Sequence, residues 1–154
     1  MKIQASIAGF SGSPITLLAV YDADSGIFFI AKQAKYTTDR SIEGALLVTN
    51  MDLPTADFRF SDDDFKDSIT SYFDLRSMGA LDIDEDLQRW YPDNQIEVDR
   101  VDESGKKYRV SPEINNGQVA VLAIAACAAK QRSINAAMDM HAEIHDIYND
   151  IITI

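Results

Sequence analysis

The sequence predicts a single α+β domain, in which an antiparallel sheet of hairpins packs on a C-terminal helix or helical hairpin. Two segments rich in strand-forming residues each surround a turn that ends in Ser-Gly. A third segment, Val119–Ala129, is apolar on every side, which is typical of a helix at the centre of a core. The length of 154 residues suits one domain, so we treat residues 1–154 as a single unit.

The first hairpin is expected at Ile15–Ala31. Its strands are rich in β-branched and aromatic residues, and Gly26 follows Asp-Ser, which favours a three-residue loop ending in a left-handed residue. Both strands are apolar on both faces, so we expect both faces to be covered. Lys2–Phe10 is predicted to add an edge strand, and Gly44–Thr49 a further strand.

A helix is predicted after Ser61, which can cap it. Asp62–Asp64 then fall in the first turn, where the helix dipole favours anions. An apolar stripe follows at helical spacing, formed by Phe65, Ile69, Tyr72 and Phe73. A second, short helix is predicted at Ile83–Tyr91, with Asp82 at its start and a proline directly after it.

The second hairpin is expected at Gln95–Val110. A three-residue loop closed by Gly105 would place Asp99 opposite Arg109, so that opposite charges meet across the strands. Such a pair contributes roughly 0.2–1 kcal/mol.

From residue 116 onward the chain is predicted to be helical, with Asn115 or Asn116 as the cap. The apolar segment Val119–Ala129 should then lie at the centre of the core. Ser133 can begin a second helix, unless the first helix continues through it. An apolar stripe near the C-terminus is predicted to face the sheet or a partner; it consists of Met140, Ile144, Ile147 and Ile151.

The charge of the chain is concentrated in residues 51–104. This acidic segment holds 16 of the 25 Asp and Glu residues and 5 of the 14 Lys and Arg residues, so it accounts for the whole net charge of −11. One interpretation is a solvated face that keeps the protein soluble. The other is a docking surface for a basic partner, because a concentrated field steers encounters between proteins.

Five acids in this segment have no evident structural task, and we expect them to contact the partner: Asp63, Asp67, Asp74, Asp84 and Asp86. Direct binding of nucleic acid or of a membrane surface is disfavoured, because both need clustered Lys and Arg. We expect a non-enzymatic inhibitor that docks on a basic, nucleic-acid-handling protein such as a nuclease. Phage or mobile-element anti-defence proteins and toxin immunity proteins have this acidic profile, and some imitate DNA. The alternatives are a phage structural or assembly protein and a metal-dependent enzyme.

The enzyme alternative depends on two incomplete motifs. His141 and His145 share a helix face, but Ala142 stands where the glutamate of a metalloprotease helix would be. Asp82, Asp84 and Asp86 resemble the start of a calcium loop, but a leucine replaces the glycine that its sharp turn needs. We therefore expect no metal, no cofactor and no catalytic residue.

Two further features favour structural roles. Gly9–Pro14 contains serines but lacks the glycine pattern of a nucleophile elbow, so a turn is expected. Cys127 lies in an alanine-rich segment and should be an inert packing residue. The lone cysteine and the absence of an apolar run of about 20 residues favour a cytoplasmic protein. No motif in the sequence identifies a family.

Overall fold

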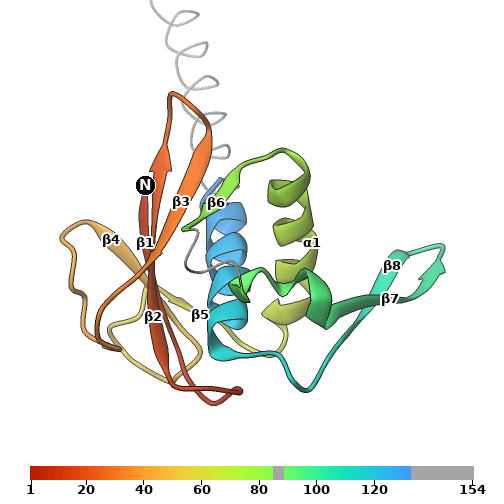
Figure 1. Ribbon diagram of the computed structural model, residues 1–154, viewed down its shortest axis with the longest axis horizontal. Helices are drawn as coiled ribbons and strands as arrows, with labels where there is room; N and C mark the ends of the chain where they lie inside the picture. Colours follow the sequence, from red (N-terminus) through yellow and green to blue (C-terminus); the bar gives the residue numbers. More distant parts are fainter. Residues whose placement is uncertain (85–88, 133–154) are drawn as a thin grey trace, which may run out of the picture.

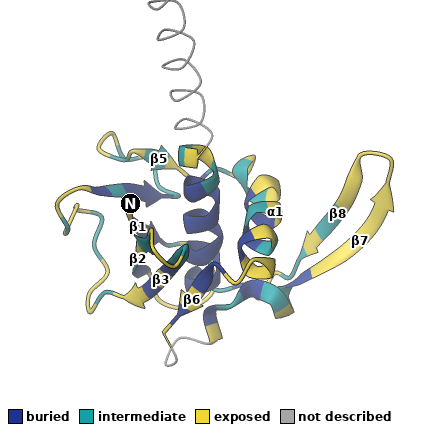
Figure 2. Cartoon of the chain, turned by 90° about the horizontal axis from the view of Figure 1, so that it is seen from above, coloured by how far each residue is buried: buried dark blue, intermediate teal, exposed yellow. Residues whose placement is uncertain are grey.

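The computed structural model describes residues 1–84 and 89–132, and it confirms the α+β class (Figure 1). A six-stranded sheet forms one layer. A helix at residues 116–132, which we call the central helix, covers one face of this sheet, and α1 (Asp64–Ser77) lies on the other side of the central helix (Figures 1 and 2). A two-stranded hairpin projects from the body beyond α1.

The large sheet has the strand order β5-β4-β1-β2-β3-β6. Its strands are β1 (Lys2–Ile7), β2 (Ile15–Asp22), β3 (Ile27–Lys32), β4 (Ala45–Thr49), β5 (Phe58–Arg59) and β6 (Leu81–Ile83). The predicted hairpin is confirmed as β2 and β3, which pair antiparallel, but its loop differs from the predicted three residues: Asp22 pairs with Ile27, which leaves four residues, 23–26, in the loop. The prediction of an edge strand at the N-terminus is wrong, because β1 lies inside the sheet between β2 and β4. Parallel pairs join β4 to β1, β5 to β4 and β6 to β3.

The central helix is the core of the molecule, as predicted. Every residue from Val119 to Ala128 is buried (Figure 2). Asn115 caps this helix: its Oδ1 accepts a hydrogen bond from the amide of Gln118 at 2.8 Å, while Gln118 Oε1 accepts one from the amide of Asn115 at 3.0 Å. The reciprocal pair satisfies two amides that the first helical turn cannot pair internally.

The second face of the sheet is only half covered, which corrects the expectation for the first hairpin. The crossover at residues 33–44 bonds to β1 and β2: the buried side chains of Gln4 and Ser6 donate to the carbonyls of Asp39 and Thr37, and the buried Thr16 hydroxyl also donates to the Thr37 carbonyl. Beyond the crossover, Val20 and Phe29 remain 42% and 44% exposed.

Helix α1 confirms the predicted apolar stripe, with Ile69 and Tyr72 buried and the phenylalanines partly buried. It begins at Asp64 rather than directly after Ser61. The Asp64 carboxylate accepts hydrogen bonds from both the backbone N–H and the hydroxyl of Ser61, at 2.8 and 2.7 Å. Ser61 therefore stabilises the helix start as a donor and not as the predicted cap.

The predicted helix at Ile83–Tyr91 is wrong at its beginning. Ile83 ends β6, and Asp82 is an exposed strand residue rather than a helix cap. After the undescribed residues 85–88, a short 3-10 helix, η2 (Pro92–Gln95), leads into the second hairpin. The acidic segment thus supplies both edge strands of the sheet, β5 and β6, and is an integral part of the body.

The second hairpin consists of β7 (Ile96–Asp102) and β8 (Gly105–Val110), but its register differs from the prediction. The loop has two residues, and a bulge at Asp99 offsets the pairing, so that Glu97 lies opposite Arg109 at 3.1 Å. Asp99 is 3.9 Å from the same guanidinium. The bulge keeps Val98 and Val101 on the face that carries Tyr108, whose ring stacks on Phe73.

Gly105→Val should destabilise this hairpin. Gly105 has φ +105°, a conformation that a β-branched residue adopts only with strain, on the order of 1–3 kcal/mol. We expect faster amide exchange in β7 and β8 of the variant, measured by hydrogen–deuterium exchange, with unchanged protection in the central helix. Wild-type protection in β8 would contradict the role assigned to this glycine.

Two of the predicted helical features fall on residues that the structure does not describe. The stripe from Met140 to Ile151 lies outside the described residues, as does the helix start at Ser133.

Candidate functional site

Three of the five acids predicted to contact a partner lie on α1. Asp63 is the N-terminal cap residue of this helix and makes no capping hydrogen bond with its side chain. Asp67 and Asp74 follow, and all three are exposed. Among residues 1–84 and 89–132, none of the three forms an ion pair. We call these residues the α1 acid row.

The other two predicted acids lie elsewhere. Asp84 directly follows β6, and its backbone N–H donates to the carbonyl of Ile30 on β3. Its carboxylate therefore belongs to the sheet layer, whereas the α1 acid row belongs to the layer beyond the central helix (Figure 1). Asp86 lies outside the described residues, and so do His141 and His145.

Asp67 faces the end of the central helix. It lines a hollow of about 290 Å³ together with Lys130 and Phe58. The Lys130 ammonium lies over the Phe58 ring, 4.7 Å from the ring centroid, and not in an ion pair with Asp67. The hollow therefore combines a carboxylate that has no ion pair within the described residues with a cation held by an aromatic ring.

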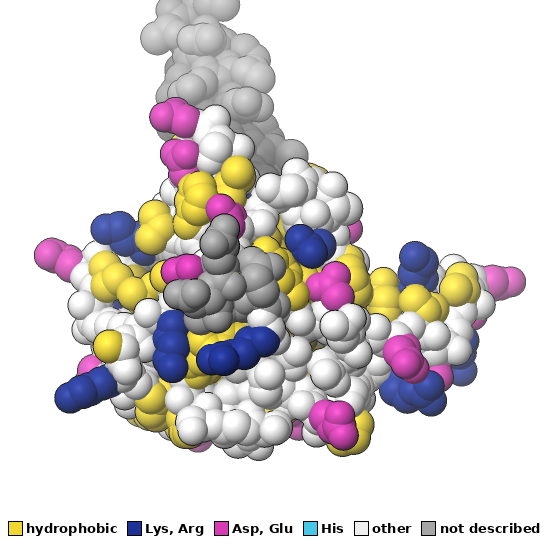
Figure 3. Space-filling view, in the orientation of Figure 1, with side chains coloured by type: hydrophobic (Ala, Val, Ile, Leu, Met, Phe, Trp, Pro, Cys, Tyr) yellow, Lys and Arg dark blue, Asp and Glu magenta, His cyan; other side chains and the backbone are white. Residues whose placement is uncertain are grey.

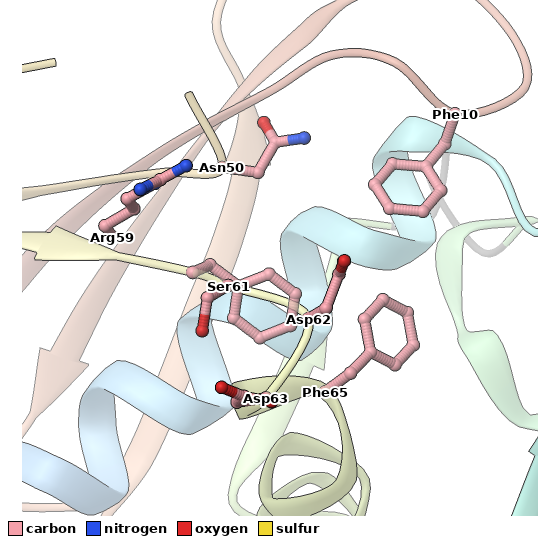
Figure 4. Close-up of a pocket in the computed structure, with 8 residues that line it drawn as sticks. Phe10, Asn50, Arg59, Ser61, Asp62, Asp63 and Phe65 are labelled. Carbon is pink, nitrogen blue, oxygen red and sulfur yellow. The ribbon is translucent and has the colours of Figure 1, made fainter. Parts of the chain in front are cut away.

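The α1 acid row begins at a pocket of about 460 Å³ (Figure 4). Three parallel neighbours in the sheet, β1, β4 and β5, end beside it, and the segments that follow them build its walls. Phe10 follows β1, Asn50 follows β4, and residues 60–63 follow β5. Crevices outside the carboxyl ends of parallel strands are common places for ligands.

The pocket has aromatic walls and carboxylates at its rim. The Phe65 ring centroid lies 6.2 Å from that of Phe10 and 5.5 Å from that of Phe60. Asp62 and Asp63 are exposed beside these rings. Carboxylates together with aromatic faces suit an organic cation such as an ammonium or guanidinium group.

The far side of the pocket is polar. Asn50 links the end of β4 to the end of β1. Its side-chain NH2 group donates to the Ala8 carbonyl at 2.6 Å, and its Oδ1 accepts a hydrogen bond from the backbone N–H of Ala8. Arg59 also lines this side. Figure 4 shows the Arg59 guanidinium directed away from the two Asp side chains, and no ion pair joins it to either within the described part of the chain.

The loop at Gly9–Pro14 is a turn, as predicted, and the start of the central helix holds it in place. The buried Asn116 side chain donates to the carbonyls of Gly12 and Ser13, at 2.9 and 3.0 Å, and accepts from the amide of Phe10 at 2.9 Å. Asn116 therefore positions an aromatic wall of the pocket from a helix more than 100 residues away in the sequence.

Cys127 is buried, as predicted, and its pKa is raised to about 11 by burial, with the charge of Asp57 adding to the effect and that of Lys130 opposing it. The thiol of a cysteine in an unfolded chain has a pKa of about 8.5. Below that pH the thiol is protonated in both states. As the pH rises toward 11, the unfolded state loses the proton and the folded state keeps it, so unfolding releases a proton and the free energy of unfolding falls.

Native Cys127 should accordingly react with iodoacetamide far more slowly than the urea-unfolded protein at pH 8. Mass spectrometry of the alkylated fraction over time measures this difference. Equal rates in the two states would show that the thiol is accessible and reactive.

Comparisons with known proteins identify no relative: no family model, no curated protein and no solved structure matches the chain. Within the described ranges, no group of three or more His, Cys, Asp or Glu side chains is placed to hold a metal ion. Among the same residues, no helix has the length and apolar character needed to cross a membrane.

Proposed function

We propose that the protein is a non-enzymatic binding protein that docks through its acidic surface on a basic partner, and that it inhibits a nucleic-acid-handling protein. The observation that carries this proposal is the α1 acid row, which is exposed, has no ion pair within the described residues and starts at an aromatic pocket. Carboxylates without ion pairs retain their full charge for a partner.

The layout of α1 supports docking. Asp63, Asp67 and Asp74 are spaced so that they share one side of the helix, apart from the buried residues Ile69 and Tyr72. Figure 3 shows acids and bases interspersed on the face that it draws, so charge on that face is mixed rather than purely acidic. A single-sign row on one helix is thus a local feature that can steer a basic surface.

The pocket supplies an anchor for such a surface. A Lys or Arg side chain of the partner would enter this pocket, lie against the rings of Phe10 and Phe65 and meet the carboxylates of Asp62 and Asp63. Side chains buried at the centre of an interface carry most of its binding energy. Lys and Arg residues that normally hold phosphates would then be occupied, which is the basis for inhibition.

Replacing Asp67 and Asp74 together by Lys should slow association with the partner and weaken its salt dependence. Charges at the rim of an interface act mainly on the association rate, and a change of sign replaces attraction by repulsion. The measurement is a kinetic binding assay, at two salt concentrations, on the basic protein captured from host lysate. Adding a DNA duplex that competes for the captured protein tests inhibition in the same assay.

The matched control carries the same change of charge elsewhere: Asp24→Lys with Glu43→Lys, both exposed residues outside α1. This control should associate nearly as fast as the wild type. If a folded Asp67→Lys, Asp74→Lys protein associates at the wild-type rate, the α1 acid row is ordinary solvated surface and the proposal fails.

A further inference from the structure

The uncovered half of the sheet presents an apolar floor that the core does not use. Alternate residues of neighbouring strands share a face, and the register places Val20 beside Phe29, and Leu18 beside Ala31. Val20 and Phe29 are 42% and 44% exposed. Exposed apolar surface that is contiguous, rather than scattered, marks interaction sites.

Two walls turn this floor into a groove of about 420 Å³. The crossover provides one wall through Ile42. This crossover is fastened to the covered half of the sheet: Gln4 Oε1 accepts hydrogen bonds from the amide and the hydroxyl of Ser41, both at 3.0 Å. The wall at Ile42 therefore stands next to a fixed point of the chain.

The opposite wall is acidic. Asp82 lies beside Phe29 in the parallel register of β6 on β3, and Asp84 lines the same groove two residues later. Lys2 lies next to Val20 on the β1 side, so the charge of the groove is negative along β6 and positive at its β1 margin. Any occupant has to match an apolar floor and a carboxylate wall.

We propose that this groove binds an apolar segment of a partner protein that carries Lys or Arg beside its apolar side chains. The apolar side chains would cover Val20 and Phe29, and the basic ones would meet Asp82 and Asp84. This site lies on the sheet layer and does not depend on the α1 acid row, so either proposal can fail alone.

Charge disfavours two other occupants. A second copy of the chain brings another net charge of −11 and an identical acidic wall. The chain's own residues 133–154 contain four acidic residues and no Lys or Arg, so they would place acids against Asp82 and Asp84. A basic segment, in contrast, pairs its cations with the acidic wall.

The test uses the full chain and three synthetic peptides of equal length, binding being measured by fluorescence polarisation. One peptide alternates Leu and Lys, one alternates Leu and Glu, and one alternates Ser and Lys. The Leu-Lys peptide should bind at least about tenfold more tightly than either of the others. If the Ser-Lys peptide binds equally well, only general charge attraction operates and the apolar groove is not the site.

Variants then locate the binding. Phe29→Ser should weaken binding of the Leu-Lys peptide by about tenfold, whereas Val101→Ser should not, although Val101 is another exposed apolar residue at 70%. Unchanged binding to Phe29→Ser overturns the proposal.

Two more outcomes would name a different occupant and reject the proposed one. Loss of a dimer in Phe29→Ser, by size-exclusion chromatography with light scattering, would assign the groove to a second copy. Peptide binding that strengthens about tenfold in Ile144→Ser with Ile147→Ser would assign it to the chain's own C-terminal residues.

Discussion

Gly117→Ala is expected to destabilise the protein by about 1–3 kcal/mol, the usual cost of an extra methyl group in a packed core. A Cβ at residue 117 would lie 2.6 Å from three ring atoms of Trp90. Trp90 cannot withdraw easily, because it is buried and Arg89 and Lys32 lie over its ring. Urea unfolding followed by circular dichroism measures the change.

The sign of this effect distinguishes packing from helix propensity. Inside a helix, alanine is normally more favourable than glycine by about 0.5–1 kcal/mol. A more stable Gly117→Ala protein would therefore show that Trp90 does not press on the helix. In a Trp90→Phe background the smaller ring should relieve the clash, so alanine at residue 117 should cost less there than in the wild type.

Local signals explain the elements that the sequence predicts. The first hairpin needs only strand-forming residues and a glycine at φ +72°, Gly26. The central helix needs only an apolar segment and a cap, and Asn115 supplies the cap together with Gln118. Each of these features is complete within a few residues, so tertiary packing does not have to choose among alternatives.

The remaining elements depend on contacts far apart in the sequence. Strand β6 has three residues and exists because it pairs with β3, about 50 residues earlier in the chain. Its Leu81 and Ile83 also fit a short helix, and periodicity cannot separate these alternatives in so short a segment. The interior position of β1 has the same origin, since its partner β4 arrives only after the crossover.

The second hairpin shows how packing selects a register. A three-residue loop and a two-residue loop with a bulge both bring acids of β7 near Arg109. Only tertiary structure distinguishes them, because Tyr108 stacks on Phe73 of α1 with ring centroids 5.8 Å apart. Charge pairing alone, worth less than about 1 kcal/mol at an exposed site, does not decide the register.

The candidate site also has a part that local sequence signals predict and a part that depends on contacts far apart in the sequence. The acids of α1 are visible in the sequence because charge and helix spacing are local properties. The pocket at the start of α1 is not, since Phe10 and Asn50 lie on two separate loops and Arg59 lies on strand β5. In the sequence, Phe10 is an aromatic residue next to a glycine-rich turn, and nothing in that pattern indicates that it lines a pocket.

Asn116→Ala is expected to cost about 2–4 kcal/mol, more than any cap substitution in the same helix. The Asn116 side chain is 2% exposed and pairs with backbone groups of the loop at Gly9–Pro14. Alanine leaves the amide of Phe10 and the carbonyls of Gly12 and Ser13 without this partner.

Asn115→Ala is the matched control, because it removes a neighbouring amide that serves only the helix start. Loss of such a cap costs about 1 kcal/mol. Urea unfolding of the two variants should therefore rank Asn116→Ala as clearly less stable than Asn115→Ala. Equal losses would mean that the loop keeps its conformation without Asn116.

The loop also connects this stability to the proposed function. Phe10 forms a wall of the pocket beside Asp62 and Asp63, and Asn116 fixes the backbone of Phe10 on both its N–H and its C=O. Asn116→Ala should thus weaken partner binding without any change of charge, mainly by faster dissociation, because an anchor side chain loses part of its pocket. Asn115→Ala should bind like the wild type. Equal dissociation rates for the two variants would show that the pocket is not part of the interface with the partner.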